Sequence, residues 1–208
     1  MKRTVVFAVS LLVLCALGAW ANDLTNGSFE WRSTDGWSRR TPTPGGGWSF
    51  LTDDVQDGVY SARFGFAPYQ GPSDHNHLWQ EKTVPAGDYI YTLSGWLKRN
   101  CVDKFGNQKP GWGYARVELA VDSVVVWSQT FDSDNQWHYF SYTTPEPVHV
   151  NSKKSAGVWW GLSAGMYDDK HEDWIILDGF VLETVVPEPV SATMLLFGLA
   201  GLALKRRK

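Results

Sequence analysis

The apolar residues between Asn22 and Val186 recur in short runs and show no sustained helical period. Runs of 5 to 10 apolar and aromatic residues are broken by Gly, Pro, Asn and Asp, which is the pattern of short strands joined by turns. The sequence therefore predicts an all-β domain. Its strands are expected near residues 26–31, 47–51, 59–66, 77–83, 88–98, 112–121, 124–131, 137–144, 147–150, 157–164 and 173–183.

Alternation of side chains assigns faces to the strands near 88–98 and 112–121, because successive residues of a strand point to opposite sides. In the first strand, the residues expected on the core side are Tyr91, Leu93 and Leu97, and those expected on the other side are Thr92, Ser94, Trp96 and Lys98. In the second, the core side is Ala115, Val117, Leu119 and Val121, and the outer side is Trp112, Tyr114, Arg116 and Glu118. Residues 174–182 are apolar on both faces, which is typical of a central, covered strand.

The N-terminal residues have the pattern of an export signal. Lys2 and Arg3 precede an uncharged run over residues 5–17, and Ala19-Trp20-Ala21 supplies the small residues that a signal peptidase requires. We therefore predict that residues 1–21 are a signal peptide that is cleaved after Ala21.

The C-terminal residues contain a second apolar segment. The uncharged run from Val190 to Leu204 has 15 residues, fewer than the roughly 20 of a usual membrane span. It ends in the basic block 205–208, which should stay cytoplasmic. A buried core helix would carry four adjacent cations into the interior, which is too unfavourable. A single hydrophobic transmembrane helix is therefore expected.

Pro187, Glu188 and Pro189, followed by the apolar run and the basic end, resemble the PEP-CTERM sorting signal of Gram-negative bacteria. The resemblance covers residues 187–208. It implies that an exosortase cuts near Pro-Glu-Pro and passes the domain, residues 22–186, from an intermediate anchored in the inner membrane to the cell surface or the extracellular matrix. Such a tail acts as a removable sorting tag.

The exported part is acidic. It carries 13 Lys and Arg against 21 Asp and Glu, a formal charge of −8, which disfavours nucleic acid and anionic polymers as partners and favours neutral ones. Because Cys15 is lost with the signal peptide, Cys101 has no internal partner for a disulfide. It is expected either to be a buried small hydrophobe or to form an intermolecular crosslink.

Short motifs along the domain resemble the galactose-binding-like jelly rolls, in particular the carbohydrate-binding modules of bacterial glycoside hydrolases. They are Asn26-Gly27-Ser28-Phe29-Glu30, Gly58-Val59-Tyr60-Ser61-Ala62, Leu78-Trp79-Gln80, Val84-Pro85-Ala86-Gly87-Asp88-Tyr89, Ser94-Gly95-Trp96-Leu97 and Leu177-Asp178-Gly179-Phe180. The resemblance spans nearly the whole domain. It implies a jelly-roll β-sandwich that binds carbohydrate.

The mature chain has 11 of the 12 Trp residues, more than a core of this size requires. An indole on the polar face of a strand is a flat apolar plate with an N–H edge, which suits the C–H face of a sugar ring. The alternative is that these aromatics pack under loops or on neighbouring strands. The residues expected to bind carbohydrate are Trp96, Trp112, Tyr114, Arg116, Glu118, Trp159 and Gln80.

Members of this fold often hold a structural calcium ion between their first and last strands. Glu30 and Asp178 occupy the matching motif positions, with Asn26 and Asp57 as weaker candidates. Carboxylate oxygens are the ligands that calcium requires. The alternative is that both carboxylates pair with Arg or cap turns.

These observations predict an exported protein that binds polysaccharide through exposed aromatic side chains and is not an enzyme. One alternative is a structural matrix protein that makes only protein contacts. Another is a glycoside hydrolase or lyase, for which the acidic segment containing Asp169 and Glu172 would supply the acid and base.

Overall fold

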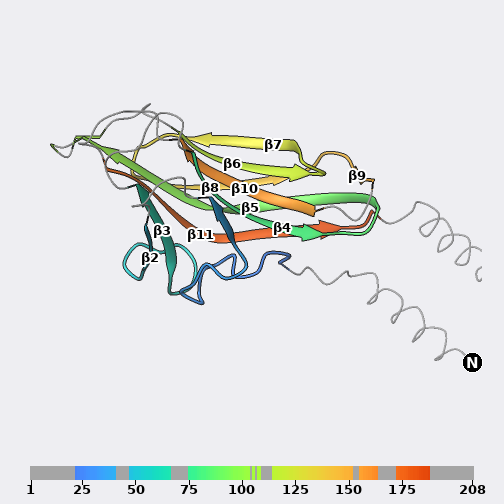
Figure 1. The fold of residues 1–208 in the computed structure, drawn as a ribbon, viewed down its shortest axis with the longest axis horizontal. Helices are drawn as coiled ribbons and strands as arrows, with labels where there is room; N and C mark the ends of the chain where they lie inside the picture. Colours follow the sequence, from blue (N-terminus) through green and yellow to red (C-terminus); the bar gives the residue numbers. More distant parts are fainter. Residues whose placement is uncertain are drawn as a thin grey trace, which may run out of the picture.

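A computed structural model describes residues 22–40, 47–66, 75–103, 105, 107–108, 114–151, 155–163 and 172–187. This part of the chain is all-β, as predicted, and contains no helix (Figure 1). Its strands are β1 (Ser38–Arg40), β2 (Gly47–Leu51), β3 (Ser61–Phe66), β4 (His75–Thr83), β5 (Gly87–Val102), β6 (Tyr114–Val121), β7 (Val124–Phe131), β8 (Trp137–Thr143), β9 (Val148–Val150), β10 (Ser155–Ser163) and β11 (Glu172–Val185).

The strands form two antiparallel sheets that pack as a jelly-roll β-sandwich (Figure 1). Sheet A is five-stranded, in the order β1-β4-β10-β6-β7. Sheet B is six-stranded, in the order β2-β3-β11-β5-β8, with β9 paired to β5. Most neighbours in each sheet are distant in sequence, so the strands meet only through long-range pairing.

The core lies between the sheets and is built by the predicted alternation. Tyr91, Leu93 and Leu97 of β5 are buried, and so are Val117 and Leu119 of β6. Each large apolar side chain removed from water in this way contributes roughly 1.5–3 kcal/mol. The burial confirms the faces that the sequence assigned to both strands.

Strand β11 lies between β3 and β5 in sheet B, as expected for a central strand. Ile175 and Leu177 point into the core, and Ile176, on the opposite face, is also buried. Its pairing with β5 shifts register between Asp178 and Val181, and Gly179 in this bulge has a φ of +57°.

The predicted strand over residues 26–31 is wrong. Asn26 and Phe29 have φ values of 53° and 59°, a left-handed conformation that interrupts an extended strand. The segment forms turns and is held by hydrogen bonds to β11, including Phe180 N–H to the Gly27 carbonyl at 3.0 Å. The short strand β1, which the sequence did not predict, follows these turns and pairs with β4.

Several terminal predictions lie outside the described residues: the signal peptide, the apolar C-terminal run and Glu188 and Pro189 of the sorting motif, of which only Pro187 is described. Within the described ranges, none of the chain forms a helix of the length and apolarity needed to span a membrane. Cys101 is buried near the end of β5, which agrees with the expectation of a small buried hydrophobe.

Candidate functional site

The outer face of sheet B carries neighbouring aromatic side chains on β5 and β8. Trp96 of β5 pairs in register with Tyr139 of β8, and Lys98 pairs with Trp137. The ring centroids of Trp96 and Tyr139 are 5.0 Å apart, and the ring planes form an angle of 52°. Tyr139 is 55% exposed. We refer to Trp96, Lys98, Trp137 and Tyr139 as the Trp96 surface.

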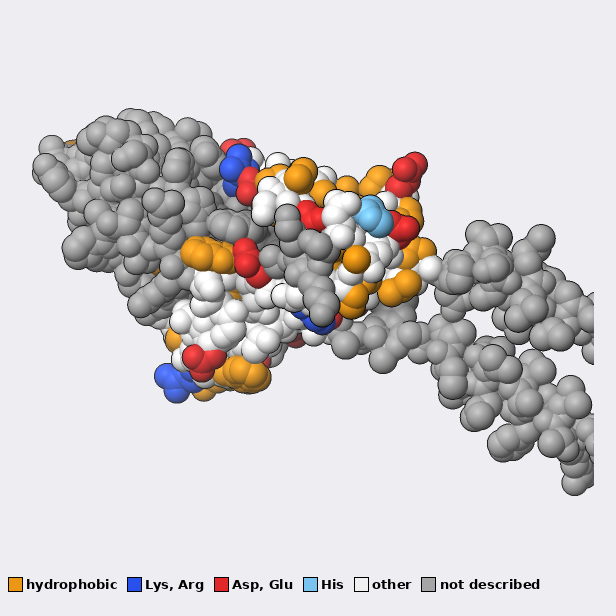
Figure 2. All heavy atoms as spheres, turned by 45° about the vertical axis from the view of Figure 1, so that its right-hand side comes forward, with side chains coloured by type: hydrophobic (Ala, Val, Ile, Leu, Met, Phe, Trp, Pro, Cys, Tyr) orange, Lys and Arg blue, Asp and Glu red, His pale blue; other side chains and the backbone are white. Residues whose placement is uncertain are grey.

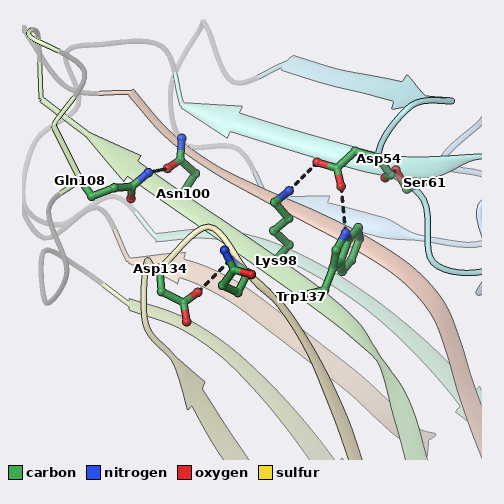
Figure 3. Close-up of polar contacts among 8 residues, drawn as sticks. Asp54, Ser61, Lys98, Asn100, Gln108, Asp134 and Trp137 are labelled. Carbon is green, nitrogen blue, oxygen red and sulfur yellow. Dashed lines mark hydrogen bonds and ion pairs between the residues drawn. The ribbon is translucent and has the colours of Figure 1, made fainter.

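Asp54, in the connection between β2 and β3, fixes two members of this surface (Figure 3). One carboxylate oxygen accepts a hydrogen bond from Trp137 Nε1 at 2.8 Å, and the other accepts one from Lys98 Nζ at 2.8 Å. The Asp54 carbonyl in turn accepts a hydrogen bond from the Ser61 hydroxyl at 2.7 Å. The carboxylate therefore orients an indole and an ammonium group beside the rings of half-buried Trp96 and exposed Tyr139.

Asp178 of β11 lies beneath the same connection and is completely buried. Its Oδ2 accepts hydrogen bonds from the backbone N–H groups of Gln56, at 2.7 Å, and Asp57, at 2.8 Å, whereas Oδ1 has no hydrogen-bond partner. Desolvation by burial, with a smaller contribution from the Asp57 charge, raises the pKa of Asp178 above its ordinary value, against the lowering effect of the backbone hydrogen bonds.

Gly179, in the bulge, lies near both the connection and Trp96. A Cβ atom there would meet Asp57 Cβ at 3.4 Å and Trp96 Cδ1 at 3.5 Å, which is ordinary contact distance. The left-handed φ at this position, and not a lack of space, favours glycine. Trp96 therefore lies between Tyr139 and the bulge.

Glu30 anchors the far end of the connection. Its Oε1 accepts hydrogen bonds from the backbone N–H groups of Val59, at 2.9 Å, and Tyr60, at 3.0 Å. Glu30 and Asp178, the two expected calcium ligands, thus both bind backbone amides of residues 56–60, which is the turn-capping alternative to a metal site.

The fit of these residues to a calcium ion is partial. Asp178 Oδ1 is a buried oxygen without a partner and suits a cation. Asn26 is engaged elsewhere, because its side chain bonds the Ser33 carbonyl and the Trp31 N–H. Among the described residues, no group of three or more His, Cys, Asp or Glu is arranged to hold a metal ion. Calcium binding therefore stays a prediction.

The outer face of sheet A carries other predicted binding residues. Arg116 and Glu118 of β6 alternate with buried Val117 and Leu119, and Arg116 Nε lies 2.7 Å from Glu118 Oε1. The backbone of Trp159 in β10 pairs with Glu118 on one side and with half-buried Trp79 of β4 on the other. For Tyr114 and Trp159 the structure describes only the backbone, and Trp112 lies outside the described residues.

The predicted binding residues consequently do not form one site. Trp96 points outward from sheet B, whereas Arg116 and Glu118 point outward from sheet A. Because the core separates the two sheets, a single sugar chain bound flat on one face cannot contact the other face. The two groups are alternative sites.

Gln80 does not fit the role expected for it. Its side chain is buried, its Oε1 accepts a hydrogen bond from the Thr25 N–H, and its Nε2 donates one to the Thr25 carbonyl at 2.9 Å. Both ends of the amide are therefore used to hold the N-terminal segment against β4, and the expected sugar contact is corrected to a structural role.

Trp137, Tyr139 and Asp54 were not among the binding residues predicted from the sequence. Trp137 and Tyr139 occupy alternate positions of a predicted strand, in which Phe140 is the buried neighbour, so the period-2 pattern contained a signal for them. No local pattern marks Asp54, which meets Trp137 across 83 residues of sequence.

No protein-family model matches the sequence, and no curated protein matches it. Among solved structures, a cyclase from Fischerella sp. TAU in complex with 4-(1H-indol-3-yl)butan-2-one is similar at a TM-score of 0.55 and 15% identity, over 82% of this chain and 100% of that one. The module TmCBM61 in complex with β-1,4-galactotriose is similar at a TM-score of 0.50 and 17% identity, over 78% and 97%.

The enzymatically active domain of tailspike protein 4 from bacteriophage CBA120 is also similar, at a TM-score of 0.52 and 12% identity. The match covers 79% of this chain but only 21% of the tailspike chain. At such identities these likenesses show the fold. The same β-sandwich occurs in a carbohydrate-binding module, in a cyclase and within a tailspike protein.

Proposed function

We propose that this chain binds polysaccharide without catalysis, through the Trp96 surface. The observation that carries the proposal is the pair of Trp96 and Tyr139, which lie side by side on the outer face of sheet B with one ring more than half exposed. Aromatic side chains that are partly open to solvent and held by packing offer apolar plates to the C–H faces of sugar rings.

The surroundings of the rings support the same ligand class. Lys98 and Asp54 lie at the edge of the surface and can hydrogen-bond hydroxyl groups while remaining paired with each other. More generally, one face of the molecule, drawn in Figure 2, carries hydrophobic side chains scattered among acidic and basic ones. The exported domain as a whole is acidic, which favours a neutral polymer. TmCBM61, which shares the fold, is described with a neutral galactotriose.

The test compares two double variants in affinity electrophoresis through gels that contain β-1,4-galactan, xylan or another neutral polysaccharide. Trp96→Ala/Tyr139→Ala removes the paired rings, and we expect affinity to fall about 10- to 100-fold, at roughly 0.7–1.4 kcal/mol for each ring. The control, Arg116→Ala/Glu118→Ala, changes the outer face of sheet A without changing the net charge, and it should migrate as the wild type does.

Loss of retention in the control alone would indicate that the carbohydrate-binding site lies on sheet A. A wild-type protein that no polysaccharide retards, but that self-associates, would favour the structural matrix protein instead. Release of reducing or unsaturated sugar ends during the assay, abolished by Asp169→Asn or Glu172→Gln, would favour the hydrolase or lyase. We expect the wild type to release no sugar ends, because the Trp96 surface would bind the polymer without cleaving it.

We also propose a route by which the protein reaches its ligand. The signal peptide and the PEP-CTERM-like tail at residues 187–208 support export, anchoring in the inner membrane and processing by an exosortase. The ligand would then be an exopolysaccharide of the cell surface or matrix. This part rests on the sequence pattern of the terminal segments.

A further inference from the structure

Trp31 lies on the N-terminal turns, outside the Trp96 surface, and is 63% exposed. The other large apolar side chains in or beside these turns, Leu24, Phe29 and Trp37, are buried. The rings of Phe29 and Trp37 stack with their centroids 5.6 Å apart. Trp31 therefore departs from the pattern of its own segment.

The backbone that carries Trp31 is fixed from both sides. Its N–H donates to Asn26 Oδ1 at 3.2 Å. The preceding residue, Glu30, binds the N–H groups of Val59 and Tyr60, and the guanidinium group of the following residue, Arg32, lies 5.1 Å from the centre of the Tyr60 ring. The indole therefore projects from a turn at residues 29–32 whose backbone is fixed beside the β2–β3 connection. We refer to this turn as the corner.

The corner is also strained. Phe29 and Arg32, which bracket Glu30 and Trp31, have φ values of 59° and 51°. A left-handed conformation at a residue other than glycine costs of order 1–3 kcal/mol. Here it turns the Glu30 carboxylate inward to the connection and leaves the Trp31 ring in solvent, so the fold maintains an unfavourable backbone at the point where an indole is exposed.

The size of the apolar patch indicates the class of ligand. Within the described part of the chain, the large hydrophobic side chain exposed next to this corner is Val59, at 58%. A stable protein interface needs about 800 Å² on each partner, far more than two such side chains provide. One exposed indole is instead about the size of a single sugar ring.

We propose that Trp31 is a second stacking platform for the same polysaccharide, separate from the Trp96 surface. This inference rests on the proposed function. The connection between β2 and β3 joins the two platforms, because Asp54 contacts Lys98 and Trp137 at one end and Val59 and Tyr60 contact Glu30 at the other. A polymer held at the Trp96 surface raises the effective concentration of its other sugar units at Trp31.

The test measures retention by polymer and by short oligosaccharide for Trp31→Ala, Trp31→Phe and Val124→Ala, using β-1,4-galactan and β-1,4-galactotriose as probes or another neutral pair that the wild type binds. Val124 is also 63% exposed but lies on β7 of sheet A. We expect Trp31→Ala to weaken polymer retention about tenfold and to leave the affinity for trisaccharide within twofold. Trp31→Phe should recover part of the loss, and Val124→Ala should behave as the wild type does.

Polymer retention by Trp31→Ala equal to that of the wild type overturns the inference, and if Trp96→Ala/Tyr139→Ala is defective in the same gels the proposed function stands. A loss shared by Trp31→Ala and Val124→Ala also overturns it, because removal of any exposed apolar group would then have the same effect. A wild type that binds no polysaccharide overturns both. A melting temperature measured for each variant separates loss of contact from loss of fold.

Discussion

At the scale of single residues, the buried carboxylate of Asp178 combines two opposing effects. Two backbone N–H groups satisfy its Oδ2, but Oδ1 is buried without a partner, and desolvation dominates and raises its pKa. A buried acceptor left without a hydrogen bond is unfavourable, more so when it is charged. Asp178 therefore anchors the connection, and it also makes the stability of the fold sensitive to pH.

The sign of this sensitivity follows from linkage. Because the pKa is higher in the folded protein, the folded state holds the Asp178 proton at pH values where the unfolded state has lost it. The stability contributed by this residue is present below the ordinary pKa of about 3.9 and is lost as the pH rises through the raised value. The amide in Asp178→Asn does not titrate, so the stability of this variant lacks this dependence on pH.

We therefore expect the difference in free energy of unfolding, wild type minus Asp178→Asn, to decrease as the pH rises through that window. Urea unfolding in EDTA at several pH values measures it. A difference that increases with pH would contradict the raised pKa. Repeating the series with calcium tests the predicted cation, because an ion bound at Oδ1 would stabilise the carboxylate and should reverse the trend in the wild type but not in the variant.

At the scale of elements, the connection between β2 and β3 is an ordered layer over sheet B. Asp178 binds its residues 56 and 57, Glu30 binds residues 59 and 60, and Asp54 reaches Trp137. Gly58 lies between the two carboxylates with a φ of +74°. A Cβ atom there would lie 2.3 Å from Glu30 Oε1, so the backbone conformation favours glycine and a side chain would displace the Glu30 carboxylate.

Gly58→Ala should consequently lower the free energy of unfolding by about 2–3 kcal/mol, of which roughly 1–2 kcal/mol comes from the left-handed backbone and the rest from displacing the Glu30 carboxylate. For a domain of this size that corresponds to a drop of about 5–10 °C in melting temperature. Asp53→Ala is the matched control, since Asp53 is exposed in the same connection. Equal melting temperatures for the two variants would show that the connection is not held as described.

At the scale of the whole molecule, the sandwich separates two outward faces and gives the N-terminal segment a structural role. Asn22, the first residue after the predicted cleavage site, bonds the Phe180 carbonyl and the Leu182 N–H through its side chain. The residue that would follow cleavage is thus already tied to β11 by its side chain.

Mass spectrometry of the protein secreted by an exosortase-containing host should find a chain that starts at Asn22 and ends near Pro187. Deletion of residues 187–208 should leave folding unchanged, because the core lies between the two sheets, and should prevent surface sorting. A mature form that retains residues 1–21, or a surface form that retains the basic end, would contradict this processing.

The all-β class, most strand positions and the faces of β5 and β6 could be predicted from sequence, because period-2 alternation is a local property that burial then enforces. It misplaced the strand at 26–31 because the left-handed backbone at Asn26 and Phe29 is set by contacts with β11 and the Trp37 indole. Local backbone preference does not predict such a turn at a phenylalanine, because this residue rarely adopts a left-handed conformation.

Which residues share a surface depends on how distant segments of the chain pack together. Trp96 meets Tyr139, and Asp54 meets Trp137, through pairings between strands and connections far apart in the chain. Asp178 lies 122 residues from the Gln56 amide that it binds. Alternation predicts whether a side chain faces the core. Its neighbours are set by the order of strands in each sheet, and that order arises from packing of the whole chain.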